Sequence, residues 1–318
     1  MGTAGVFEEH RSLLFTIAYE ITGTVTDAED VVQESFLRWS GVDAEAVQNP
    51  RAYLAKTVTR QALNSLRAAQ RRREDYIGPW LPEPVVTAPD VAENAVLSES
   101  LSFAMLVVLE TLSPDERAVF VLREVFDFPY AEIAEATDKS LAAVRQIASR
   151  AKAHVRARQP RFEVDARQRR AVADRFLTAL LGGDMQSLMD VLAPGAVLLS
   201  DGGGKVTAAR KPVMGADNIA RFLTGIAKNP VPDMRVESSS LNGMPALIIY
   251  SGDRVDLAAL IESSNEQVTG IYLVRNPDKL GAATKAPSFR TLFTPEQGSQ
   301  NLGGAVAAPH PAPFIGEG

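Results

Sequence analysis

The sequence predicts a multidomain fold in which two all-α domains precede an α+β domain. Apolar side chains recur at helical spacing through residues 7–73 and 96–158, and cap signals stand at several helix starts. Four prolines interrupt residues 74–95, so regular helix is not expected there. Beyond about residue 165, short strand-like runs follow a single helix.

The domain boundaries follow from these changes in pattern. The chain has 318 residues, of which 46% are hydrophobic, and this is enough for two or three compact domains. We expect a first helical domain at 1–73, a linker at 74–95, a second helical domain at 96–160, an α+β domain at 165–282 and a disordered tail at 283–318. The tail is rich in Gly, Ala and Pro, a composition that does not support a packed core.

The net charge of −6 conceals two cationic segments. Residues 51–73 hold seven Lys and Arg and no acid, and residues 141–170 hold nine against Glu163 and Asp165. Phosphate binding depends on local charge, because each neutralised phosphate releases counterions. Both segments are therefore candidates for contact with a polyanion, while the acidic remainder suits a basic protein partner.

Composition also excludes several classes of site. The absence of cysteine excludes disulfides and thiolate metal sites, and the three histidines show no ligand spacing. We therefore expect no metal site and no cofactor. No apolar run reaches the ~18 residues that a membrane span requires, and no signal peptide is visible. The expected location is the cytoplasm, with no membrane partner.

The first helical domain contains a helix with an acidic outer face. It is predicted to start at Thr26, which forms a capping box with Glu29. The inner stripe consists of Ala28, Val31, Val32, Ser35, Phe36 and Trp39. The outer face carries Asp27, Asp30, Gln33 and Glu34. Charged helix faces are usually only solvated, so this face alone does not define a site.

A basic helix follows and is predicted to begin at Asn49-Pro50, since proline suits the first helical position. Its inner positions are Tyr53, Leu54, Val58, Ala62 and Leu66. Its outer positions are Arg51, Lys56, Arg60, Asn64 and Arg67, and it ends in Arg71, Arg72 and Arg73. Seven bases without an acid favour a surface that faces a polyanion over a face that is merely solvated.

A helix-turn-helix is predicted at residues 130–154. Tyr130 to Ala136 forms the first helix, Thr137 to Lys139 the turn, and Ser140 the N-cap of the second helix. The second helix has one apolar face and one exposed face, which suits a DNA major groove. The exposed face carries Ala142, Arg145, Gln146, Ser149, Arg150 and Lys152. Arg145 and Gln146 suit base edges, because Arg pairs with guanine and Gln with adenine, whereas Arg150 and Lys152 suit phosphates.

The α+β domain is predicted from one helix at 169–181, a second at 217–227 and several strand-like runs. These runs lie at 197–200, 246–250, 255–261 and 268–274. Asn242-Gly243 is a hairpin signal, since both residues tolerate positive φ.

The order of these features resembles the two-domain sigma factors of the extracytoplasmic-function group. Asp27-Ala-Glu-Asp-Val-Val-Gln-Glu34 with Trp39 is similar to sigma region 2.2, Asn49 through Arg73 to regions 2.3 and 2.4, and Tyr130 through Arg150 to region 4.2. The resemblance implies that the first domain binds core RNA polymerase and the −10 element, and that the second binds the −35 element. The implied polymerase contacts are the β′ clamp helices and the β flap.

This resemblance assigns the exposed residues to three implied sites. Polymerase binding is expected at Asp27, Asp30, Gln33, Glu34 and Arg38. Contact with the −10 element is expected at Arg51, Lys56, Arg60, Asn64, Arg67 and Arg71. Contact with the −35 element is expected at Ser140, Ala142, Ala143, Arg145, Gln146, Ser149, Arg150 and Lys152. The turn lacks the glycine common in the family, and Ala142 and Ala143 stand where polar residues are frequent.

Three short motifs resemble those of the sigma-factor subgroup with a SnoaL-like C-terminal extension, which includes the sigma-J type and has the cone-shaped ketosteroid-isomerase fold. They comprise Trp80, Leu81, Pro82, Glu83 and Pro84; Asp201, Gly202, Gly203, Gly204 and Lys205; and Asn276, Pro277, Asp278, Lys279 and Leu280. Exposing Trp80 would waste apolar area, so we expect it to dock on a neighbouring domain. The C-terminal domain is thus expected to regulate the sigma factor in cis, although a simple hairpin also explains the glycine-rich loop.

An alternative interpretation is a SnoaL-like cyclase or isomerase, or a ligand-sensing domain, fused to a helix-turn-helix regulator. Asp201, Asp217, Asp253 and Asp256 are the available acids, but no sequence context marks them as catalytic. We expect no enzyme activity. The sequence leaves open a small-molecule ligand of the C-terminal domain, and a polar-lined pocket with a buried carboxylate would favour the alternative.

Overall fold

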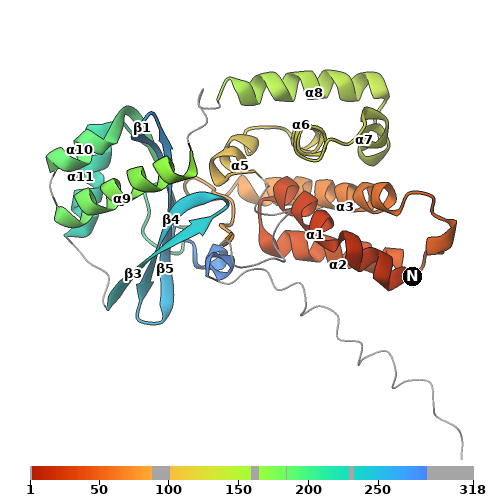
Figure 1. Ribbon diagram of the computed structural model, residues 1–318, viewed down its shortest axis with the longest axis horizontal. Coiled ribbons are helices and arrows are strands. Elements are labelled where there is room, and N and C mark those ends of the chain that lie inside the picture. The colour runs from red at the N-terminus through yellow and green to blue at the C-terminus, as the bar shows by residue number, and fades with distance from the viewer. Residues whose placement is uncertain (1, 88–100, 159–164, 184, 229–232, 285–318) are drawn as a thin grey trace, which may run out of the picture. The chain divides into compact units, whose positions relative to one another are not determined.

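The structure is a computed structural model that describes residues 2–87, 101–158, 165–183, 185–228 and 233–284. Helices make up the first part of the chain, and a mixed α+β domain follows (Figure 1). The predicted fold class is therefore confirmed. The predicted tail lies outside the described residues from 285 onward, as does the end of the linker at 88–95. Ala283, which we assigned to the tail, is instead buried in the C-terminal domain.

Three helices form the first region: α1 (Thr3–Thr22), α2 (Val25–Trp39) and α3 (Pro50–Arg73), with a short 3-10 turn, η1 (Ala44–Ala46), before α3. Trp39 is buried between them and donates its indole N–H to the Thr3 carbonyl at 2.7 Å. The predicted start of α2 was two residues late. Thr24, rather than Thr26, is the N-cap, and its hydroxyl accepts the Asp27 N–H at 3.2 Å.

The second region contains the helix-turn-helix. Its elements are α5 (Phe103–Leu109), α6 (Pro114–Phe120), a π-helical turn η3 (Val121–Val125), α7 (Tyr130–Thr137) and α8 (Leu141–Arg156). Ser140 caps α8 as predicted, accepting the Ala143 N–H at 3.2 Å. Asp138 adopts the left-handed conformation, with φ of 57°, at the end of α7. It fills the place of the expected glycine, since Asp tolerates this conformation better than most residues.

The C-terminal domain is a six-stranded sheet in the order β2-β1-β6-β5-β4-β3. Its helices are α9 (Ala166–Gly182), α10 (Met185–Val191) and α11 (Ala216–Ala227). Its strands are β1 (Leu192–Asp201), β2 (Val213–Met214), β3 (Met234–Leu241), β4 (Met244–Ser251), β5 (Arg254–Ser264) and β6 (Gln267–Val274). Only β1 and β6 pair in parallel; the other neighbours are antiparallel. Two 3-10 turns follow, η4 (Pro277–Lys279) and η5 (Gly281–Ala283).

The strand predictions were correct for β1, β4, β5 and β6 and missed β2, β3 and helix α10. Asn242 and Gly243 form the predicted hairpin between β3 and β4, with φ of 46° and 67°. Half of the residues of strand β3 are exposed, and the strand carries Glu and three serines, so its sequence lacks the alternation of apolar residues that predicts a strand.

Each face of the sheet is covered by a different part of the chain. Helices α9, α10 and α11 pack on one face around an apolar cluster that includes Phe176, Leu198 and Ile271 (Figure 1). Leu81 of the linker and Phe103 of α5 belong to the cluster on the other face, where Phe103 lies 5.6 Å from the ring of Tyr272. The C-terminal domain thus shares a hydrophobic core with the linker and the second helical region.

Candidate functional site: a DNA- and polymerase-facing surface with an interdomain clamp

The predicted polymerase-binding side chains lie together on α2. Asp30, Gln33, Glu34 and Arg38 are exposed and Asp27 is half-buried, while the opposite face of the helix is buried. Arg38 and Glu34 form a surface ion pair at 2.8 Å. Leu37 also lies on this face with 63% of its side chain exposed, and the sequence analysis overlooked it. An exposed leucine amid charged residues is the signal that would have found it.

The predicted −35 face of α8 is open to solvent. Ser140, Ala142, Arg145, Gln146, Ser149 and Arg150 are exposed, while Ala143 and Lys152 are half-buried. Lys152 is paired with Glu124 at 2.5 Å, and Arg150 lies 3.8 Å from Glu116. Among the described residues, no ion pair engages Arg145. The face that would enter a major groove is thus preformed and accessible.

The predicted −10 face of α3 is, in contrast, partly covered by the second helical region. Lys56 pairs with Glu135 of α7 at 3.0 Å, and Arg60 donates to the Glu135 carbonyl at 2.9 Å. Arg67 pairs with Asp115 of α6 at 2.8 Å. Further along the face, the Arg51 guanidinium stacks 4.5 Å from the ring centre of Phe128. Of the predicted set, Asn64 and Arg71 are exposed and have no described partner.

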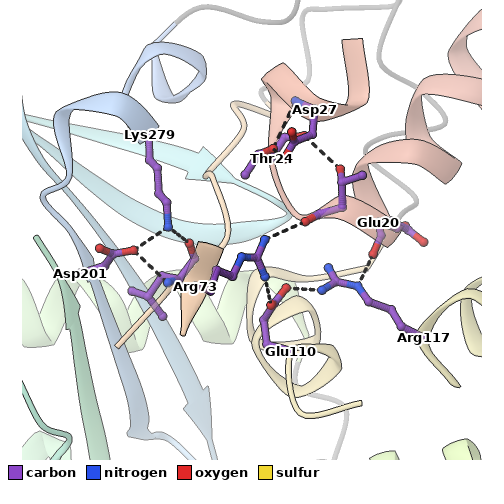
Figure 2. A network of polar contacts seen from close by, with 10 residues as sticks. Glu20, Thr24, Asp27, Arg73, Glu110, Arg117, Asp201 and Lys279 are labelled. Atoms are coloured by element: carbon purple, nitrogen blue, oxygen red, sulfur yellow. Dashed lines mark hydrogen bonds and ion pairs between the residues drawn. The ribbon is translucent and has the colours of Figure 1, made fainter. Parts of the chain in front are cut away.

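The linker is held to the C-terminal domain by a buried ion pair between Asp201 and Lys279 (Figure 2). Their charged atoms lie 2.7 Å apart, Leu81 donates its N–H to Asp201 at 2.9 Å, and Lys279 donates to the Leu81 carbonyl at 2.6 Å. Burial lowers the pKa of Lys279 to about 8 despite the opposing effect of Asp201. Asp201 and Lys279 thus bind the linker backbone directly.

Trp80 is in contact with two cations. Its ring centre is 3.4 Å from the Arg73 guanidinium carbon and 3.9 Å from the Lys279 ammonium. A Cβ at Gly23 would lie 2.9 Å from the Trp80 ring, so the close approach of the indole to the first helical region requires glycine there. The tryptophan is therefore a shared contact of α3, the linker and the C-terminal domain, as expected of a docked aromatic side chain.

A second contact ties the linker to α1 and to the β3–β4 hairpin. The Tyr19 hydroxyl donates to the Glu83 carbonyl at 2.7 Å and accepts from Asn242 at 2.8 Å. The Glu83 carboxylate accepts the Val25 N–H at 2.8 Å, at the start of α2. Burial raises the pKa of Glu83, an effect that the Val25 N–H opposes. Leu81, Pro82, Glu83 and Pro84 are all buried.

A polar network joins α3 to the second helical region (Figure 2). Glu110 lies between Arg73, at 2.6 Å, and Arg117, with which it forms a close ion pair. Arg117 also donates to the Glu20 carbonyl at 2.8 Å, and Glu20 accepts the Leu101 N–H at 3.1 Å. Glu20 is fully buried, its second carboxyl oxygen has no partner, and burial raises its pKa to about 8. The sequence analysis missed Glu20, although a lone acid in an apolar stretch signalled it.

The glycine-rich loop after β1 is shaped by packing. A Cβ at Gly203 would lie 2.5 Å from the Asn276 amide nitrogen, and one at Gly204 would lie 3.0 Å from Ile77 of the linker. Asn276 in turn donates to the Tyr76 hydroxyl at 3.0 Å. Lys205 pairs with Asp278 at 2.5 Å on the exposed side of the loop. The three motifs therefore meet in space.

Two family comparisons define the class of the protein. Residues 6–72 match the family "Sigma-70 region 2", and residues 102–155 match "Sigma-70, region 4". These matches cover helices α1 to α3 and the helix-turn-helix region, so the chain has the two DNA-binding modules of a sigma-70 factor.

Full-length relatives then give the family. The chain is 37% identical over 287 residues to the ECF RNA polymerase sigma factor SigJ of Mycobacterium tuberculosis, covering 86% of this chain and 91% of the relative. It is 27% identical to the probable ECF RNA polymerase sigma factor SigI of that organism, and the match covers 87% of this chain and 94% of the relative. The crystal structure of M. tuberculosis SigJ superposes with a TM-score of 0.72 at 34% identity, over 89% of this chain and 99% of that one. The chain belongs to the ECF RNA polymerase sigma factors.

Proposed function

We propose that this sigma factor uses α2 for core RNA polymerase, α8 for the −35 element and α3 for the −10 element of its promoters. The partners of a sigma factor are core RNA polymerase and promoter DNA. The observation that carries the assignment is the exposed face of α8, where Arg145 and Gln146 lie on a helix that Ser140 caps. Bidentate contacts of this type discriminate between bases by about 1–3 kcal/mol each.

The test is run-off transcription with core polymerase and a promoter library, comparing the natural chain with Arg145→Ala. Arg145→Ala is expected to relax selectivity at one or two −35 positions and to reduce the yield of the preferred promoter. Arg221→Ala, on the surface of α11, is the matched control and should behave as the natural chain. Unchanged selectivity in Arg145→Ala would remove that residue from promoter reading.

We further propose that the C-terminal domain regulates initiation in cis by clamping the linker. Asp201 and Lys279 support this, because they bind the linker backbone while Trp80 and Glu83 bind the first helical region. The two DNA-reading regions are thus joined through a linker that the third domain holds. The expected compartment is the cytoplasm, and none of the described helices is long and apolar enough to cross a membrane.

The enzyme alternative receives little support from the same domain. The pocket beside its glycine-rich loop is lined by residues that include Ser200, Lys205 and Arg210, and none of its lining residues is an acid. Asp201, the domain's most buried acid, forms an ion pair with Lys279 and accepts a hydrogen bond from the linker. Asp256 is paired with Arg275 at 2.8 Å. A general acid or base needs an accessible group with a shifted pKa near substrate. We therefore assign the domain no catalytic role.

A further inference from the structure

The pocket beside the glycine-rich loop lies where the linker packs against the C-terminal domain. Ile77 and Gly78 of the linker form one wall, and Ser200 of β1 and most residues of the loop at 202–210 form the rest. Its volume is about 530 Å³, within the range of about 300–1,000 Å³ that is typical of small-molecule sites. No lining residue belongs to the apolar cluster beneath α9, α10 and α11, so the pocket is separate from the interior of the domain.

The linker wall lies close against the loop. A Cβ at Gly78 would lie 3.7 Å from the Cα of Arg210, which is ordinary van der Waals contact. Gly78 also has φ of 88°, a conformation that other residues seldom adopt. Because two of the lining residues belong to the linker, the pocket is complete only while the linker is docked on the C-terminal domain.

The lining carries two cations and no acid. Arg210 is exposed and forms no ion pair with a described residue. Lys205 pairs with Asp278, but 53% and 60% of these two side chains are exposed, and a pair of this kind contributes little free energy. An anionic group can therefore bind both cations without displacing a strong interaction.

Hydrogen-bond donors without protein partners line the same pocket. Ser200 is only 2% exposed, and its hydroxyl has no hydrogen-bond partner among the described residues. The backbone N–H groups of residues 207–210 likewise donate to no described residue. A buried polar group is nearly always hydrogen-bonded, to protein, water or a ligand. Ser200 therefore indicates, independently of the charges, a ligand with oxygen acceptors.

Apolar side chains complete the lining. Ile77 is 53% exposed, and Val206, Ala208 and Ala209 are half-buried. Covering apolar surface of this kind is favourable. A ligand that satisfies the whole lining therefore has both an anionic group and an apolar body, which an inorganic ion lacks.

We propose that this pocket binds a small organic anion whose carboxylate or phosphate oxygens contact Arg210, Lys205 and Ser200. Ile77 and Val206 contact its apolar body. Since one wall belongs to the linker, the bound anion holds the linker on the C-terminal domain. This inference rests on the proposed regulation in cis and adds a chemical signal to it.

Saturation-transfer NMR on the full chain tests the site with phenyl phosphate and with benzoate. The two probes share an aromatic body and differ in the anionic group, so the tighter of the two identifies the preferred head group. Benzyl alcohol has a similar body without a charge and is the control. At least one anion should bind saturably, and benzyl alcohol should bind much more weakly.

Arg210→Gln should weaken binding of the tighter anion about tenfold, because it removes a charge-assisted hydrogen bond. Ser200→Ala should weaken it several-fold through the loss of a neutral one. Lys211→Gln is the matched control, since Lys211 is the exposed neighbour of Arg210 and does not line the pocket. It should bind the anion as the natural chain does, and circular dichroism verifies the fold of each variant.

Hydrogen exchange of linker residues 76–87 tests whether the anion holds the linker. At a concentration about ten times its dissociation constant, the anion should slow the exchange of these amides by up to about tenfold, because it binds only the docked linker. Arg210→Gln at the same concentration should show a much smaller effect.

Four results would overturn the proposal. Benzyl alcohol that binds as tightly as the anions would show that charge is not recognised. Equal losses in Arg210→Gln and Lys211→Gln would indicate diffuse attraction to a basic loop. The other two are the absence of saturable anion binding at millimolar concentrations and an unchanged exchange of the linker on binding.

These titrations contain neither polymerase nor promoter, so they report on the site alone. A failure of the regulation in cis would appear elsewhere, as run-off transcription that is the same for the natural chain and for Asp201→Asn/Lys279→Met.

Discussion

Lys56 of α3 and Glu135 of α7 form an ion pair with their charged atoms 3.0 Å apart, and the Glu135 carbonyl also accepts from Arg60. Glu135 of the second helical region thus binds Lys56 and Arg60, two cations that the proposed contact with the −10 element requires. The −35 face of α8 is meanwhile open. In this arrangement one promoter-facing surface is accessible and the other is partly blocked by the chain itself.

Glu135→Gln should therefore increase binding of a single-stranded −10 oligonucleotide by the free protein, because Lys56 loses its competing carboxylate. An exposed pair of this kind contributes at most about 1 kcal/mol, so the expected gain is several-fold at low salt. Fluorescence anisotropy with a labelled oligonucleotide measures it. Glu132→Gln, on the same helix and without a described ion pair, is the control. Equal affinities for all three proteins would show that Glu135 does not compete with DNA.

Asp201→Asn should destabilise the linker clamp strongly. Lys279 would be left in a buried site without its partner and would have either to keep an uncompensated charge or to release its proton, and such a loss typically costs about 3–5 kcal/mol. Chemical denaturation of the full chain measures the change. The double variant Asp201→Asn/Lys279→Met should lose less free energy of unfolding than the two single variants lose in sum. Lys205→Met breaks the exposed pair with Asp278 and should leave the free energy of unfolding nearly unchanged. Additive effects at Asp201 and Lys279 would contradict their coupling.

Stability should fall as the pH rises from about 4.5 towards 8, because of Glu20. Burial raises the pKa of its carboxyl group from 4.5 to about 8 in the folded chain, while Arg117 and the Leu101 N–H oppose the shift. The folded state therefore keeps a proton that the unfolded state releases. The contribution is complete below pH 4.5 and is lost as pH approaches 8, at up to about 1.4 kcal/mol per pH unit.

Glu20→Gln should remove this part of the pH dependence, since an amide cannot ionise. Thermal unfolding of both proteins between pH 5 and 8 provides the measurement, and the variant should gain relative stability towards pH 8. The pH range distinguishes Glu20 from Lys279. The pKa of Lys279 is lowered from 10.5 to about 8, so its effect on stability falls between pH 8 and 10.5, where stability rises with pH. Parallel pH curves for the two proteins would exclude Glu20 as the titrating group.

Charge reversal at Asp30 and Glu34 should weaken assembly with core polymerase while leaving the fold intact, since both side chains are exposed. Asp30→Lys/Glu34→Lys is therefore expected to raise the dissociation constant in a polymerase titration, with an unchanged circular dichroism spectrum. Asp43→Lys/Glu45→Lys, in the exposed turn before α3, changes the net charge by the same amount and is the control. Unaltered affinity of the double variant would place the polymerase contact elsewhere.

Local signals in the sequence predicted most of the elements. The Asn242-Gly243 hairpin and the Ser140 cap depend on neighbouring residues, and both predictions were correct. The start of α2 was misplaced because Thr24 and Thr26 are both plausible caps, and only tertiary contacts such as the Glu83 bond to Val25 select between them.

Long-range partners were not predictable in the same way. The bond between Asn242 and Tyr19 joins residues 223 positions apart, and a single sequence carries no record of such pairing. The sequence indicated that Trp80 of the linker docks on a neighbouring domain. It did not indicate that Asp201 binds the backbone of Leu81, or that acids of α6 and α7 face the cations of α3.

Five of the seven linker residues from Leu81 to Thr87 form hydrogen bonds through their backbone with the rest of the chain, and Val86 and Leu241 form an isolated β-bridge. A segment of this kind has a fixed length and register, unlike a flexible tether. Chimaeric factors built by fusing this C-terminal domain to other sigma modules would therefore need residues 73–87 transplanted together with it, and inserting even one residue there would disconnect the graft.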